Sequence, residues 1–242
     1  MLQLVALVDY FNVVPVARGA SANLRTHLNG LEEMVSAIEA YSHALIPRPS
    51  ELRFRLYGGW FDAASRMKTN AREILGAISR RYYPTRGRFR VFLEPADSLL
   101  SLPGADLTAT VRTTPGLVPF MIDLRPPACV IPGPSCHLSS LRSWQQGRCP
   151  NHPACSVRTS DVCSSIRQKL VDTALVADMF TAAQDPEQWV LAVSNDDDIV
   201  PGVIAASRIS PRVNLVRLDR RMPSPYDDLL KNFSIQLADL RS

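Results

Sequence analysis

The sequence is poor in lysine and has no long apolar run. Only three of its 27 Lys and Arg residues are lysine, at Lys68, Lys169 and Lys231. No segment approaches the roughly 20 apolar residues that a membrane-spanning helix needs. The apolar start, Met1 to Val8, is short, lacks a basic region and runs straight into Asp9, so we expect no signal peptide. We therefore predict a cytoplasmic protein that makes no membrane contact.

Phosphate-binding glycine motifs are also missing. The chain has no GxGxxG and no GxxxxGK[ST] segment, which weakens the case for a nucleotide-binding module. The net charge of +4 is too small to imply nucleic-acid binding by itself. The preference for arginine over lysine suits phosphate recognition, because the guanidinium is a planar fork, but genome base composition favours arginine equally well.

The 242 residues have a globular composition, with 46% hydrophobic and 21% charged residues. Their pattern predicts strands over residues 3–8, 52–57, 89–93, 189–193 and 213–218. It predicts helices over residues 20–45, 164–183, 199–206 and 226–240, and a further helix that contains Met67 and Ile74 and ends at about Arg81. Residues 106–112 and 117–124 are expected to form a hairpin or two edge strands. This alternation indicates an α/β fold with three layers and a central, mostly parallel sheet.

Residues 125–163 break the alternation, and we interpret them as an insertion rich in proline and cysteine. All five cysteines lie there, and their odd number without a secretory signal disfavours disulfides. Zn²⁺ binds four thiolate or imidazole ligands tetrahedrally. The candidate zinc ligands are Cys136, Cys149, Cys155 and Cys163, with His152 or His137 replacing one of them. The alternative is a loop with free thiols, because the spacing matches no standard zinc motif.

Acidic side chains follow the ends of two predicted strands. Asp9 and Asn12 follow the first strand, and Asp196 begins an Asp-Asp-Asp run after another. Asp172 lies in an otherwise apolar helix that is able to pack over the same edge. In an open parallel sheet, sites form beyond the carboxyl ends of the strands. Converging carboxylates would bind Mg²⁺ or Mn²⁺, which supports phosphodiester hydrolysis. Each acid taken alone is more often a helix cap or turn residue. Asp178, six positions after Asp172, is expected to be exposed.

Three motifs make the sequence resemble the NYN domains of the PIN-like nuclease superfamily. They are Val8-Asp9-Tyr10-Phe11-Asn12, Lys169-Leu170-Val171-Asp172-Thr173-Ala174-Leu175 and Val193-Ser194-Asn195-Asp196-Asp197-Asp198-Ile199-Val200-Pro201. Tyr10, Leu170 and Asn195 stand where that family usually has glycine. The resemblance covers most of the chain outside 125–163 and implies a single PIN-like domain over residues 1–242. It also implies that Asp9, Asp172, Asp196 and Asp198 bind the metal and that Asn12 orients water or substrate.

The resemblance implies a metal-dependent nuclease, and an endoribonuclease in particular, because the family is associated with RNA cleavage. The residues expected to contact the nucleic acid are Arg18, Arg25, Trp60, Lys169 and Ser194. RNA is favoured over DNA as the substrate, and a second copy of the chain or a protein partner stays open. The alternative is a PIN-like regulator with little activity that binds nucleic acid or protein.

Overall fold

The computed structural model describes most of the chain as two compact units, which are considered separately. The described residues are 3–14, 24–46, 51–58, 60, 69–81, 90–104, 111–115, 137–168, 170–218, 224–233, 235 and 237–239. Unit 1 comprises Met1–Thr110 and Lys169–Ser242, and unit 2 comprises Val111–Gln168. Of the helices in these ranges, none has both the length and the apolar character needed to cross a membrane.

Unit 1 is built on a parallel sheet of six described strands in the order β3-β2-β1-β6-β7-β8. The strands are β1 (Gln3–Asp9), β2 (Glu51–Tyr57), β3 (Arg90–Pro95), β6 (Gln188–Val193), β7 (Val213–Arg217) and β8 (Leu237–Asp239). β1 lies inside the sheet, and its residues 4–9 are all buried. Strands covered on both faces are continuously apolar instead of alternating, which explains the run from Leu4 to Val8.

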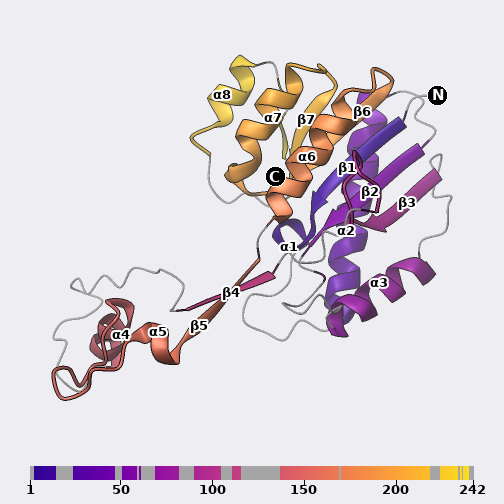
Figure 1. Cartoon of the computed structure of the whole chain (residues 1–242). Helices are drawn as coiled ribbons and strands as arrows, with labels where there is room; N and C mark the ends of the chain where they lie inside the picture. Colours follow the sequence, from indigo (N-terminus) through magenta and orange to yellow (C-terminus); the bar gives the residue numbers. More distant parts are fainter. Residues whose placement is uncertain are drawn as a thin grey trace. The chain divides into compact units, whose positions relative to one another are not determined.

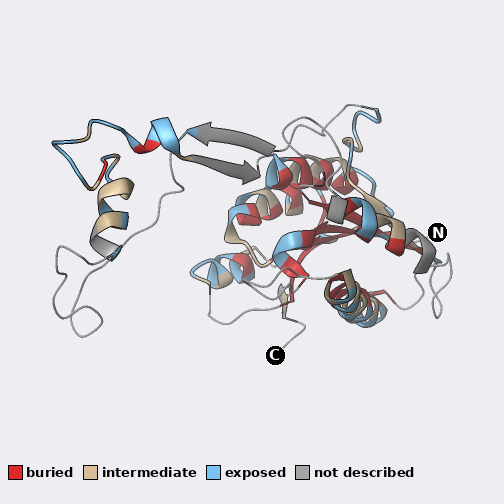
Figure 2. Cartoon of the chain, turned by 90° about the horizontal axis from the view of Figure 1, so that it is seen from below, coloured by how far each residue is buried: buried red, intermediate tan, exposed pale blue. Residues whose placement is uncertain are grey.

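Helices cover both faces of this sheet (Figure 1). Helices α2 (Leu24–Leu45) and α3 (Thr69–Arg81) share one core with the even-numbered residues of β1. Helices α6 (Val171–Ala183) and α7 (Val200–Ser207) share the other core with Val5 and Leu7. Short helices α1 (Tyr10–Val13), η1 (Asp197–Ile199) and α8 (Asp227–Asn232) complete the described part of the unit. The buried residues lie in the strands and on the sides of the helices that face them (Figure 2).

The described part of unit 2 contains an antiparallel strand pair and two helices. β4 (Val111–Pro115) pairs with β5 (Ser164–Gln168), and Val111 lies opposite Gln168. Helices α4 (His137–Gln145) and α5 (Thr159–Val162) lie between these strands in the sequence. The unit thus extends beyond the proline- and cysteine-rich stretch 125–163, since its two ends form the strand pair.

The α/β fold with its parallel sheet between helices is confirmed, but two helix predictions need correction. The helix expected over residues 164–183 begins only at Val171, because Ser164–Gln168 form β5. The helix expected over residues 226–240 ends at Asn232, and Leu237–Asp239 join the sheet as β8. The strand expected over residues 106–112 overlaps β4 only at residues 111 and 112, and β4 pairs with β5. Residues 105–110 and 116–124 lie outside the described residues.

Candidate active site at the ends of β1 and β6

The predicted acidic site lies where two neighbouring strands end. β1 pairs with β6 so that Val8 lies opposite Val193, which places Asp9 and Ser194 at adjacent strand ends. On its other side β1 pairs with β2, so the strand order changes direction between β1 and β6. Such a switch point separates the connections that leave the two strands and creates a binding crevice at their carboxyl ends.

The Ser194 hydroxyl connects the polar groups of this edge. It donates a hydrogen bond to Asp9 Oδ2 at 3.2 Å and accepts bonds from Asn12 Nδ2 at 3.4 Å and from the Asp196 backbone N–H at 3.1 Å. Ser194 is fully buried. Because its one donor is used on Asp9, the serine fixes the orientation of that carboxylate. Ser194 thus arranges the polar groups of the site, and its contact with substrate stays a prediction.

Asn195 holds the loop after β6 against its neighbours on both sides. Its amide nitrogen donates to the Asn12 carbonyl at 3.0 Å, and its side-chain oxygen accepts from the Leu218 backbone N–H at 2.9 Å. Asp196 then caps the short helix η1 by accepting a bond from the Asp198 N–H at 3.0 Å. Asn195 therefore makes side-chain contacts that a glycine at this position would lack.

Asp9 has an unusually basic carboxylate for an aspartate. The side chain is only 6% exposed, and its burial, together with the charge of Asp172, raises its pKa to about 6. The charge of Asp196 raises this pKa further, whereas hydrogen bonds from Asn12 and Ser194 lower it. Asp9 therefore lies close enough to both Asp172 and Asp196 for their charges to affect its pKa, although the three residues are far apart in the sequence.

The remaining acids of the Asp-Asp-Asp run have different surroundings. Asp197 pairs with Arg217, at 2.6 Å between Oδ1 and Nη2, and accepts a bond from Ser224 at 2.7 Å. Asp198 is exposed and contacts Asp196 through its backbone N–H. Asp197 therefore anchors the loop to β7, and the structure gives Asp198 no contact between its carboxylate and the other acids.

The donor set suits a hard divalent cation. Carboxylate, amide and hydroxyl oxygens are the ligands that Mg²⁺ and Mn²⁺ prefer. In the part of the chain that the structure describes, no three His, Cys, Asp or Glu side chains form a metal site. Mg²⁺ needs only one or two protein carboxylates, because it keeps several waters. A cation near Asp9 would also relieve the repulsion among the three acids.

Of the other four residues expected to contact substrate, the structure describes Trp60 and Arg25. Trp60 is 1% exposed, and its indole nitrogen donates to the Leu56 carbonyl at 3.1 Å, so it belongs to the core. Arg25 is exposed in the first turn of α2. The start of α2 lies beside α1, because the His27 ring stacks on Tyr10 with centroids 6.1 Å apart. Arg18 and Lys169 lie outside the described residues.

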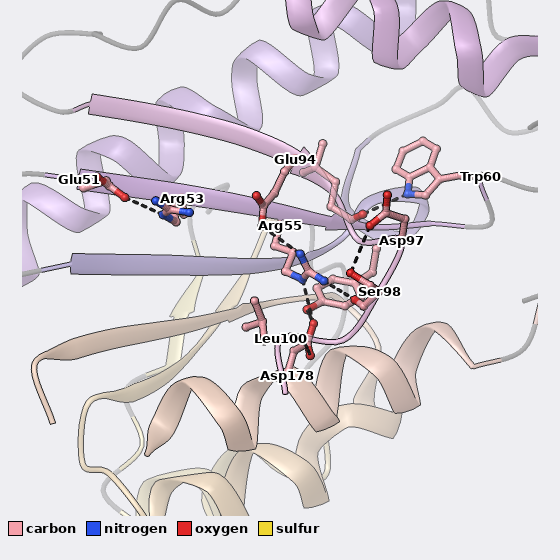
Figure 3. A network of polar contacts seen from close by, with 11 residues as sticks. Glu51, Arg53, Arg55, Trp60, Glu94, Asp97, Ser98, Leu100 and Asp178 are labelled. Atoms are coloured by element: carbon pink, nitrogen blue, oxygen red, sulfur yellow. Dashed lines mark hydrogen bonds and ion pairs between the residues drawn. The ribbon is translucent and has the colours of Figure 1, made fainter. Parts of the chain in front are cut away.

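Asp178, expected to be exposed, is completely buried between α6 and β2 (Figure 3). Its Oδ2 accepts bonds from Arg55 Nε at 2.8 Å and from the Tyr57 hydroxyl at 2.5 Å, and its Oδ1 accepts the Leu100 N–H at 2.7 Å. Burial and the charge of Asp178 raise the pKa of Tyr57 well above its usual value. Tyr57 therefore stays protonated and acts as a donor.

Arg55 extends this network to the segment after β3 (Figure 3). Its Nη1 contacts Glu94 at 2.9 Å, and its Nη2 donates to the Ser98 carbonyl. The helix that carries Asp172 is thus fixed to β2 by a buried ion pair. The sequence signal was an arginine at position 55 within a strand of the central sheet, because a buried arginine requires an acidic partner.

The cysteine loop of unit 2 contains thiols without disulfides among the described residues. Cys149 is buried, and Cys155 and Cys163 are partly exposed. The loop is closed by backbone bonds from His152 N to Cys149 O and from Cys155 N to Asn151 O. His152 is exposed, and Cys136 lies outside the described residues. Within residues 137–168 these side chains form no group of three metal ligands.

No protein-family model matches the chain, and comparisons with curated proteins and with solved structures likewise give no match.

Proposed function

We propose that this protein is a metal-dependent nuclease that hydrolyses phosphodiester bonds, with RNA as the favoured substrate. The observation that carries the proposal is the electrostatic coupling of Asp9, Asp172 and Asp196 at the carboxyl ends of β1 and β6. The motifs that resemble the NYN family meet at this point. A cluster of carboxylates at a switch point is typical of sites that bind a divalent cation and phosphate.

Asp9, with Asp172 or Asp196, would hold Mg²⁺ or Mn²⁺. When bound, the metal would supply an activated water and neutralise charge on the phosphate. Asp9 must lose its proton to bind the cation, and its hydrogen bond from Ser194 keeps the carboxylate in place. Asn12 is exposed beside Asp9 and is suited to hold a substrate or water oxygen.

The alternative is a PIN-like regulator that binds nucleic acid or protein but has little activity. The raised pKa of Asp9 favours the nuclease, because a protein that only binds an anion gains nothing from repelling carboxylates at its binding edge. Exposed arginines such as Arg25 suit either function.

A cleavage assay with single-stranded RNA and DNA in Mg²⁺ or Mn²⁺ separates these functions. We expect Asp9→Asn and Asp196→Asn to reduce cleavage by at least about 100-fold, since each removes a charge at the metal. Asp228→Asn is the matched control, because that carboxylate is 92% exposed and paired only with Lys231 at 3.2 Å in the described part of the chain. Equal cleavage by all four proteins, or none by wild type, contradicts the nuclease.

A structural zinc in unit 2 stays a prediction from the sequence. Elemental analysis of protein purified without chelator tests it, and about one zinc per chain is expected from a four-ligand site. Protein without zinc that has the same thermal stability after chelator treatment contradicts it.

A further inference from the structure

An exposed aromatic residue lies in the same short helix as Asn12 of the acidic site. Phe11 follows Asp9 by two positions and precedes Asn12, and it is 38% exposed, whereas its neighbour Tyr10 is fully buried. Phe11 therefore presents an accessible aromatic ring next to Asn12 in the sequence.

Three other rings immobilise Phe11. It makes an edge contact with Tyr10 at 5.1 Å and 90°, a tilted contact with Trp60 at 5.4 Å, and an edge contact with His27 at 6.3 Å. Tyr10, Trp60 and His27 are themselves buried. A ring held in this way loses little conformational entropy when a ligand stacks on it.

Gly58 at the end of β2 makes room for this arrangement. A Cβ atom at position 58 would lie 2.9 Å from two Trp60 ring carbons and 3.1 Å from Phe11 Cε2. Because such distances are shorter than normal carbon contacts, a larger residue would displace Trp60 or Phe11. The close approach of Trp60 and Phe11 thus leaves no room for a side chain at position 58.

We propose that Phe11 is a stacking platform for an unpaired base next to the scissile phosphate. This inference rests on the proposed nuclease function and assigns the substrate as single-stranded. An aromatic side chain stacks on a base of any identity, provided the base is unstacked and accessible. Phe11 offers a ring without hydrogen-bonding groups, so it favours single strands over duplexes without selecting a base.

The test measures binding of oligonucleotides to the full chain carrying Asp9→Asn, which suppresses cleavage. The probe is a single-stranded RNA with one 2-aminopurine, whose fluorescence reports stacking. Phe11→Ala is added to this background, and Phe11→Tyr is the conservative variant. Tyr226→Ala is the matched control, because Tyr226 is 40% exposed and lies at the start of α8.

We expect Phe11→Ala to weaken single-strand binding about tenfold and to abolish the fluorescence change. Phe11→Tyr and Tyr226→Ala should leave both signals intact. An abasic site at the stacked position should weaken binding to the Phe11 protein by the same factor and should have no further effect on Phe11→Ala. A duplex of the same sequence should bind both proteins equally.

The outcomes distinguish this inference from the function on which it rests. The stacking role is overturned if the wild-type chain cleaves with metal, and Phe11→Ala changes neither this cleavage nor the 2-aminopurine fluorescence. The nuclease function then still holds. A wild-type chain that neither binds nor cleaves any of the oligonucleotides overturns both. Urea unfolding of each variant shows whether a loss of binding is caused by misfolding. If Phe11→Ala is misfolded, Phe11→Tyr still tests whether an aromatic ring at this position is sufficient.

Discussion

Asp9 shows how one residue's surroundings favour function at the expense of stability. Its pKa is raised to about 6 from an ordinary value of 3.8, because burial and Asp172 disfavour the charged form. The folded state then binds a proton more tightly than the unfolded state does. Stability is therefore lost as the pH rises from about 4 through 6, and the loss is complete at neutral pH.

Asp9→Asn should accordingly stabilise the metal-free protein at pH 7 by up to about 3 kcal/mol. The gain should be much smaller near pH 4, where the folded-state carboxyl is protonated and the unfolded-state carboxyl is close to its ordinary pKa of 3.8. Urea unfolding in EDTA at pH 4, 5, 6 and 7 measures it. Mg²⁺ should stabilise the wild type more than the variant, because a cation offsets the same repulsion. A stability difference that does not change with pH contradicts the raised pKa.

Leu170 is a residue in an unusual backbone conformation at the start of α6. Its φ is +69°, in the left-handed region, and its side chain is 42% exposed. Left-handed conformation costs a branched residue roughly 1–2 kcal/mol, and glycine avoids that cost. Leu170 therefore carries the strain of a turn that suits glycine.

Leu170→Gly should therefore be more stable than Leu170→Ala by about 1 kcal/mol. Both variants remove the exposed side chain, but only glycine relieves the backbone. Thermal unfolding of the two proteins, side by side, measures the difference. If alanine proves equal to or better than glycine, the left-handed turn does not persist in solution.

At the scale of elements, α6 was only partly predictable. The spacing of Asp172 and Asp178 places them on different faces of the helix, and the structure agrees. The prediction that Asp178 is exposed was wrong. Helix α6 packs on the sheet and beside α7, and it buries the face that carries Asp178. The start of α6 was also misplaced, since Ile166 continues its apolar spacing while pairing with Thr113 of β4. Local periodicity carries no information about so distant a strand partner.

The parallel core and the position of the acidic edge were predictable, because local sequence patterns do indicate them. The runs around Leu7 and Leu191 are apolar at every position, which is typical of strands covered on both faces. Asp9 follows its run directly and Asp196 follows Val193 after two residues, so the predicted strands also located these acids near the sheet edge. No local pattern indicated that the Ser194 hydroxyl connects the site or that Trp60 is buried. Both features depend on packing between segments that are distant in the sequence.

The ion pair between Arg55 of β2 and Asp178 of α6 should be the costliest polar contact to break. Asp178→Leu leaves the buried guanidinium with only the partly exposed Glu94 as its acidic partner and should destabilise unit 1 by up to about 3–5 kcal/mol. Arg55→Met combined with Asp178→Leu should lose much less than the sum of the single changes, because neither residue is then left alone. Denaturant unfolding of the four proteins in the double-mutant cycle gives the coupling energy, and additive losses contradict the pair.

At the scale of the whole molecule, unit 2 is an insertion that leaves the topology of unit 1 intact. Val111 pairs with Gln168, so the chain enters and leaves unit 2 at neighbouring points. The sheet, both helical layers and the three coupled carboxylates all belong to unit 1. Unit 1 also has two extensive cores of its own, which is the usual requirement for independent folding.

Replacement of residues 111–168 by a short Gly-Ser linker should therefore leave unit 1 folded. The linker needs only a few residues, because paired antiparallel strands lie about 5 Å apart. We expect cooperative unfolding and metal-dependent cleavage of short oligonucleotides within about threefold of the full chain, since closure of a short loop costs little. Circular dichroism and the cleavage assay measure this. A folded variant that has lost cleavage would instead assign a part of the active site to unit 2.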